Sequence, residues 1–228
     1  MAGNVERIEE RIAAACLRCG RRREDVALLA VSKFRAAGEV EVAWAAGLRI
    51  FGESRVQEAA GKFAGFAEGH PGAALHFVGG LQRNKVGAAV SLFDCIQSVD
   101  RDALAAALAA GTAGRAVPLP VMLELRTGEA SKGGFSDVDG LLRVTEFILG
   151  CSSLRVCGLM TMAPFTEDRA EVRSAFRRLA AAGRAVTGRF PGLGVLGLSM
   201  GMSGDFEIAV EEGSTMLRIG SGIFDGGV

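Results

Sequence analysis

Short apolar runs recur along the chain, and segments with helical spacing separate them. Residues 26–32 form a nearly unbroken apolar run, which is typical of a strand buried on both faces of a parallel sheet. Further short runs predict strands at residues 48–52, 75–78, 92–99, 117–125, 154–160, 195–199 and 215–219. The pattern therefore indicates a chain built on a largely parallel sheet.

Between these runs, apolar residues recur at three- and four-residue spacing, which predicts helices. The predicted helices cover residues 4–19, 39–47, about 53–66, 102–110, 138–149, 167–190 and 205–212. Eight strands alternating with helices in 228 residues predict one domain, residues 1–228, folded as an α/β (β/α)8 TIM barrel with an extra N-terminal helix. A doubly wound open sheet is the structural alternative.

Charge and composition exclude several classes of function. The chain has 26 basic and 26 acidic residues, and no arginine cluster or aromatic platform suggests a groove for nucleic acid. The N-terminus is charged and helix-patterned, unlike a signal peptide, and no apolar run approaches the roughly 18 residues of a membrane span. We therefore expect a cytoplasmic monomer that binds neither nucleic acid nor membranes.

The five cysteines form an odd set, which fits reduced thiols better than a disulfide framework. Cys16 and Cys19 have the spacing of some zinc and redox sites, but no second pair with metal-ligand spacing follows. Both fall on the apolar helical stripe that contains Ile8 and Ile12. We predict that both are core thiols and that the protein has no metal site.

Lys33 follows the first predicted strand, where a barrel would place it on the functional face. Partial desolvation of a lysine there favours the neutral amine, which forms a Schiff base with a carbonyl compound. The alternative is a lysine that ends its strand in solvent. The other lysines, Lys62, Lys85 and Lys132, have polar surroundings, and we predict that they are solvated surface residues.

Small and hydroxyl residues follow the last two strands, in segments 199–203 and 218–222. Barrels often bind phosphate at these loops, because small residues let backbone amides approach an anion. Strand eight neighbours strand one in a closed barrel, so Lys33 is expected beside this loop. Together they imply a phosphorylated carbonyl compound, either a phosphosugar in a class I aldolase-like site or pyridoxal 5′-phosphate, whose pyridine nitrogen Arg218 could face.

Several motifs occur in a specific order from residue 30 to the C-terminal region. They are Ala30-Val-Ser-Lys33, Phe51-Gly-Glu-Ser-Arg-Val-Gln-Glu58, Leu75-His-Phe-Val-Gly-Gly-Leu-Gln-Arg-Asn-Lys85, Gly128-Glu-Ala-Ser-Lys132, Gly158-Leu-Met160, Leu198-Ser-Met-Gly-Met-Ser203 and Gly213-Ser-Thr-Met-Leu-Arg-Ile-Gly220. Their combination resembles the YggS/PROSC family of pyridoxal phosphate homeostasis proteins. The resemblance implies a single barrel, like the N-terminal domain of alanine racemase, that binds pyridoxal 5′-phosphate without established turnover.

By position in those motifs, the resemblance implies a set of cofactor-binding residues. Lys33 would hold the cofactor as an internal aldimine, and Arg218 would face the ring nitrogen. The phosphate would be bound by Ser199, Met200, Gly220 and Ser221. Ser221 stands where the family often has threonine.

Three further positions lie in or near the motifs, and two of them depart from the family pattern. His76 would lie in the third strand, either supporting the cofactor site from behind or as a hydrogen-bonded core histidine. Ser54 would lie near the cofactor, but it replaces the asparagine usual in the family, which puts one side-chain contact in question. Gly80 replaces the usual proline or histidine, which loosens its loop.

We therefore expect a non-catalytic pyridoxal 5′-phosphate-binding protein of cofactor homeostasis, with apo-enzymes as transient recipients of the cofactor. The alternative is an amino-acid racemase or related fold-type III enzyme that uses the same cofactor. Such two-base racemases pair a lysine with a tyrosine, whereas this chain has no tyrosine and ends soon after strand eight, without a second domain. A nicotinamide dehydrogenase is disfavoured, because the G-x-G-x-x-G string at residues 192–197 follows a helix and leads into a strand.

Overall fold

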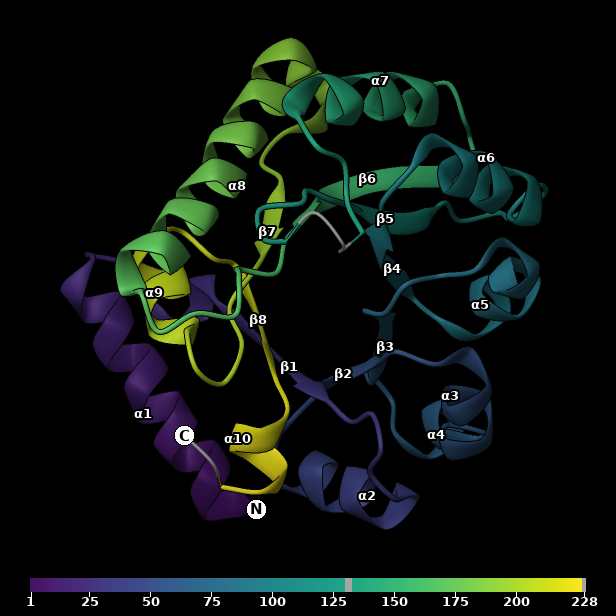
Figure 1. The fold of residues 1–228 in the computed structure, drawn as a ribbon. Coiled ribbons are helices and arrows are strands. Elements are labelled where there is room, and N and C mark those ends of the chain that lie inside the picture. The colour runs from purple at the N-terminus through teal and green to yellow at the C-terminus, as the bar shows by residue number, and fades with distance from the viewer. Residues whose placement is uncertain (130–132, 227–228) are drawn as a thin grey trace.

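The computed structural model describes residues 1–129 and 133–226, and its strands close into one parallel barrel in chain order (Figure 1). The strands are β1 (Ala27–Val31), β2 (Ile50–Glu53), β3 (Ala74–Phe77), β4 (Cys95–Val99), β5 (Leu119–Glu124), β6 (Leu154–Met160), β7 (Gly197–Ser199) and β8 (Met216–Ile219). Closure comes from parallel pairing of β1 with β8, in which Leu29 lies opposite Arg218. The predicted (β/α)8 barrel is confirmed, and the doubly wound alternative is wrong.

Helices form the outer layer around the barrel (Figure 1). They are α1 (Ala2–Arg18), α2 (Ala37–Ala45), α3 (Val56–Lys62), α4 (Phe66–Gly69), α5 (Val86–Leu92), α6 (Asp102–Gly111), α7 (Val138–Leu149), α8 (Arg169–Arg189), α9 (Phe206–Glu211) and α10 (Ser221–Phe224), with short 3-10 turns η1 (Arg23–Asp25), η2 (Arg83–Lys85) and η3 (Pro191–Leu193). Within the described ranges, none of these helices is long and apolar enough to cross a membrane.

Two predicted boundaries are wrong. The segment Val86–Leu92 is helix α5, and β4 begins only at Cys95, because the apolar residues of α5 lie on one buried helical stripe. A short apolar run does not by itself distinguish a strand from a buried helix. The predicted helix at 53–66 is interrupted, since Gly65 adopts a left-handed conformation with φ of 69° before α4.

Close packing inside the barrel explains why β2 has a glycine at position 52. A Cβ atom on Gly52 of β2 would lie 2.4 Å from Leu29 Cδ2 of β1, so the side chain of Leu29 occupies that space. The two strands pair in parallel beside these residues, with Val31 opposite Gly52. The absence of a side chain at Gly52 therefore lets the C-terminal half of β1 pack directly on β2.

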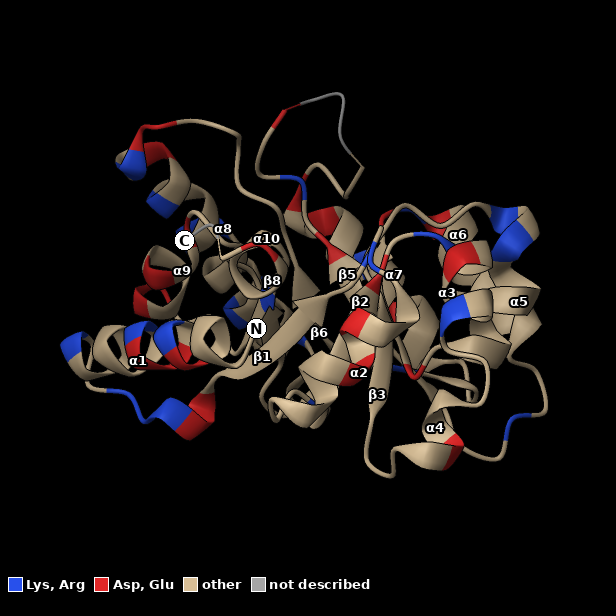
Figure 2. Cartoon of the chain, turned by 90° about the horizontal axis from the view of Figure 1, so that it is seen from below, with Lys and Arg blue, Asp and Glu red and all other residues tan. Residues whose placement is uncertain are grey.

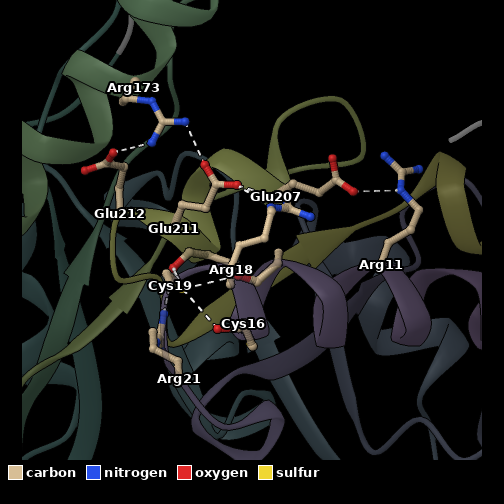
Figure 3. Close-up of polar contacts among 11 residues, drawn as sticks. Arg11, Cys16, Arg18, Cys19, Arg21, Arg173, Glu207, Glu211 and Glu212 are labelled. Atoms are coloured by element: carbon tan, nitrogen blue, oxygen red, sulfur yellow. Dashed lines mark hydrogen bonds and ion pairs between the residues drawn. The ribbon is translucent and has the colours of Figure 1, made fainter.

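Helix α1 covers the side of the barrel formed by α9 and α10, with a buried stripe of Val5, Ile8, Ile12, Ala15 and Cys16. Figure 3 shows ion pairs that cross its edge, Arg11 to Glu207 at 3.1 Å and Arg18 to Glu211 at 2.9 Å. Because these side chains are partly exposed, the ion pairs contribute little, and the apolar stripe holds the helix.

The two cysteines of α1 belong to this interface. Cys16 is buried, which confirms the prediction of a core thiol. Cys19 is a half-buried free thiol at the end of the helix, and its Sγ donates to Ala15 O at 3.3 Å (Figure 3). Among the described residues, no group of three or more His, Cys, Asp or Glu side chains is arranged to hold a metal.

Replacing Ile12 tests the role of the stripe. Ile12 is fully buried, so Ile12→Ala should lower the free energy of unfolding by about 2–5 kcal/mol. Leu17→Ala, on the exposed face of the same helix, should change it by less than about 0.5 kcal/mol. Urea denaturation of both variants measures the difference, and equal effects would contradict the assigned packing.

Candidate functional site

A cavity of about 420 Å³ opens at the C-terminal ends of β1 and β8. Its lining consists of Val31, Lys33, Phe34, Arg35, Val78, Met162, Met202, Ser203, Gly204, Arg218, Gly220 and Ser221. Because β1 pairs directly with β8, the turn that carries Lys33 lies beside the loop that begins at Gly220. The structure thus brings together four predicted site residues, Lys33, Arg218, Gly220 and Ser221.

Hydroxyl groups and small residues form the β7–β8 side of the cavity. Ser203 Oγ accepts a hydrogen bond from Gly222 N at 3.1 Å and lies 3.1 Å from Ser221 Oγ. A Cβ atom on Gly220 would lie 3.3 Å from Val31 O, so a larger residue would crowd the approach of the two strands. Ser203 is absent from the predicted binding residues, although it ends the predicted phosphate segment at 199–203.

Ser199 and Met200 are both fully buried, and neither belongs to the cavity lining. Ser199 Oγ donates to Gln97 Oε1 at 2.6 Å and accepts from an Arg218 Nη at 2.8 Å. The backbone N–H of Met200 donates to Met216 O at 3.1 Å. Ser199 therefore supports Arg218 from inside the barrel, and the hydroxyls that reach the cavity come later in the loop.

Arg218 provides a fixed positive charge at the floor of the cavity. Arg218 is 5% exposed, and its guanidinium donates to Ser199 Oγ and, at 2.7 Å, to Thr161 O. Burial lowers the pKa of Arg218 to about 10, while the charges of Asp205 and Glu124 act in the opposite direction. The guanidinium therefore stays protonated at neutral pH.

His76 lies at the far end of the same buried network. Its Nδ1 is 2.8 Å from Gln97 Nε2, and Gln97 also accepts from Ser199. Burial lowers the pKa of His76 to about 4, so the ring is neutral at physiological pH, and these partners assign Nδ1 as the acceptor. His76 is absent from the cavity lining and connects to Arg218 through Gln97 and Ser199.

Ser54 occupies a different place from the other predicted site residues. It lines a separate cavity of about 220 Å³, together with Gly80 and the half-buried Lys85. Its placement gives no support to direct contact with a ligand beside Lys33. Lys132 lies outside the described residues, as does part of the motif at 128–132.

Lys33 follows the solvent-exposed alternative, and the expectation that Lys62 is solvated is wrong. The Lys33 side chain is exposed. Lys62, predicted to be solvated, has a side chain only 6% exposed and donates to Ser32 O at 2.6 Å. Lys62 is the last residue of α3 and contacts the turn that carries Lys33. This contact depends on how α3 packs on the barrel.

Another cavity, of about 260 Å³, adjoins the cavity that contains Lys33, and Met162 and Met202 line both. Glu124, at the end of β5, lines this adjoining cavity. Burial raises the pKa of Glu124 to about 7, the charge of Asp100 adds to the increase, and Arg218 opposes it. A carboxyl group that titrates near neutral pH is a typical feature of functional sites.

Residues 4–226 match the family described as alanine racemase, N-terminal domain. The pyridoxal phosphate homeostasis protein of Vibrio cholerae is 39% identical to this chain, over 97% of this chain and 94% of that protein. The chain belongs to the pyridoxal phosphate homeostasis family. The resemblance found in the sequence motifs is thereby confirmed.

Solved structures of similar proteins agree with this family assignment. PipY of Synechococcus elongatus, with pyridoxal phosphate bound, superposes with a TM-score of 0.81 at 34% identity, covering 95% of this chain and 99% of PipY. Alanine racemase from E. faecalis has a TM-score of 0.67 at 19% identity, and the match covers 95% of this chain and 57% of the racemase. The second likeness concerns the fold alone.

The raised pKa of Glu124 predicts a specific dependence of stability on pH. The folded protein keeps this proton up to about pH 7, whereas the unfolded chain releases it near pH 4.5, so stability falls as pH rises between these values. Glu124→Gln removes this loss. Relative to the unmodified protein, the variant should gain up to about 3 kcal/mol between pH 4.5 and pH 8.

Urea denaturation at several pH values, without added ligand, measures this gain. His76 contributes an opposite trend between about pH 4 and 6.5, but it does so in both proteins and cancels in the difference. Glu10→Gln, on the exposed face of α1, is the matched control and should run parallel to the unmodified protein. A parallel curve for Glu124→Gln would contradict the raised pKa.

Proposed function

We propose that this protein binds pyridoxal 5′-phosphate through Lys33 and serves in homeostasis of that cofactor. The observation that carries the proposal is the shared cavity, which is lined by Lys33, by Ser203 and Ser221, and by the buried Arg218. The names of the relatives and the ligand of PipY support the same cofactor.

The residues fit the chemistry of this cofactor. The Lys33 amine can condense with an aldehyde, forming a C=N bond and releasing the carbonyl oxygen as water. Ser203 and Ser221 offer hydroxyl donors to a phosphate, and the contact of Gly220 with β1 keeps the loop close to Lys33. When bound, the cofactor supplies an electron sink, which the positive charge of Arg218 near a pyridine nitrogen would weaken.

We further propose that binding, without dedicated turnover, is the function. The chain has no tyrosine to act as the second base of a lysine–tyrosine racemase. Glu124 favours the alternative, a cofactor-dependent racemase or related enzyme, because a carboxyl group with a pKa of about 7 can exchange protons at neutral pH. Alanine racemisation at an enzymatic rate, about 1 per second or more, would establish that alternative.

The proposal extends to the cellular setting. We propose that the protein acts as a cytoplasmic monomer and that apo-enzymes receive the cofactor from it. Figure 2 shows basic and acidic residues intermixed along α1 and acidic residues on neighbouring α9, which supports a partner other than nucleic acid.

Borohydride reduction tests the role of Lys33. Addition of pyridoxal 5′-phosphate should produce visible Schiff-base absorption, and reduction should fix the label on Lys33, as mapped by mass spectrometry. Lys33→Ala should abolish the absorption and the label, because it removes the only amine among the described residues that line the cavity. Lys85→Ala, in the separate cavity, is the control and should behave like the unmodified protein. A label elsewhere, with normal binding by Lys33→Ala, would defeat the proposal.

The serine hydroxyls predict a phosphate-dependent loss of affinity. Ser203→Ala should raise the Kd for pyridoxal 5′-phosphate about ten-fold or more, since a hydrogen bond to a charged group contributes about 1.5–3 kcal/mol. The Kd for pyridoxal, which has no phosphate, should change much less. Ser91→Ala, on the exposed face of α5, is the control, and fluorescence titration measures each Kd. Equal losses for both ligands would place the phosphate elsewhere.

A further inference from the structure

Lys62 is a buried cation whose hydrogen-bonding capacity is fully used. Its Nζ donates to Ser32 O at 2.6 Å, Glu53 Oε1 at 2.8 Å and Glu58 Oε1 at 2.9 Å. An ammonium group has three N–H donors, so each has a partner. The Glu53 side chain is fully buried, and those of Lys62 and Glu58 are 6% and 24% exposed. A surface lysine would not be held in this way.

The cluster of Lys62, Glu53 and Glu58 forms hydrogen bonds with the residues on both sides of Lys33. Before it, Ser32 O accepts from Lys62, and Ser32 Oγ donates to Glu53 Oε1 at 2.7 Å. After it, the backbone N–H of Phe34 donates to Glu58 Oε1 at 2.6 Å. Lys33 therefore lies between two residues, Ser32 and Phe34, that the cluster holds by hydrogen bonds, and Lys33 lines the cavity.

The turn also contains a strained residue. Phe34 has φ of 64°, in the left-handed region, although its side chain is 67% exposed and gains little from burial. For a residue other than glycine this conformation is unfavourable, so surrounding contacts must maintain it. The charge-assisted bond from Phe34 N to Glu58 offsets this cost, and Lys62 holds that carboxylate in place.

We propose that Lys62 is a positioning residue for Lys33: through Glu53 and Glu58 it fixes the 32–34 turn so that the Lys33 amine meets an aldehyde in the cavity. This inference rests on the proposed binding of pyridoxal 5′-phosphate. Lys62 itself does not touch the cavity, and its effect is transmitted by Ser32 O and by Glu58 to Phe34 N.

The test needs a variant that folds. Lys62→Met alone would leave the carboxylate of Glu53 buried without its cation, which is strongly destabilising. The double variant K62M/E53Q removes both charges together and keeps similar side-chain volumes. The matched reference is E53Q, so that any difference between the two proteins reports Lys62.

Hydrogen exchange in the protein without cofactor gives the first readout. The Phe34 amide should exchange about ten-fold faster in K62M/E53Q than in E53Q, since its acceptor Glu58 is no longer held. Amides within β1 should exchange alike in both proteins, which distinguishes release of the turn from general unfolding. Unchanged exchange at Phe34 would overturn the proposal.

Ligand binding gives the second readout. Borohydride labelling of Lys33 by pyridoxal 5′-phosphate should require about ten-fold more cofactor in K62M/E53Q than in E53Q. The Kd for pyridoxine 5′-phosphate, which has the ring and phosphate but no aldehyde, should remain within about two-fold. Unchanged labelling, or equal loss of both ligands, would overturn a positioning role. If the unmodified protein does not label at Lys33, the proposed function fails, while exchange at Phe34 still decides whether Lys62 fixes the turn.

Discussion

The site depends on the parallel pairing of β1 with β8, which closes the barrel. The first and last strands of the chain become neighbours only through this closure, and each ends at the same mouth. Lys33 then lies across one cavity from the Gly220 loop, although most of the sequence separates them. An open sheet with its strands in the same order would leave Lys33 and the small-residue loop at opposite edges.

Buried charge is the second constraint, because it is costly unless every charged group has partners. Arg218 has Ser199 and Thr161 as hydrogen-bond acceptors, and Asp205 and Glu124 as nearby acidic groups. Buried charged groups with partners add little net stability over apolar packing. Once buried, however, each charged side chain can occupy few positions that keep its partners. The charges of this barrel therefore contribute mainly to the geometry of the mouth.

Strand order and loop chemistry make much of this site predictable from the sequence. A barrel pattern places Lys33, Arg218, Gly220 and Ser221 at one mouth, and the structure agrees. Ser199 lies outside the cavity lining because it is still part of β7, and the hydroxyl residues that line the cavity are Ser203 and Ser221. The burial of Lys62 was not predictable from its polar neighbours, since it arises from the packing of α3 against the β1 turn.

The contrast between Lys33 and Lys62 supports the choice of Lys33 as the proposed nucleophile. A carboxylate beside an amine favours the charged ammonium, which has no lone pair to attack a carbonyl. Glu53 and Glu58 both lie under the Lys33 turn, yet both bond to Lys62. Within the described residues, Lys33 has no carboxylate at ion-pair distance. By engaging these two acids, Lys62 keeps both carboxylates from pairing with the proposed nucleophile, Lys33.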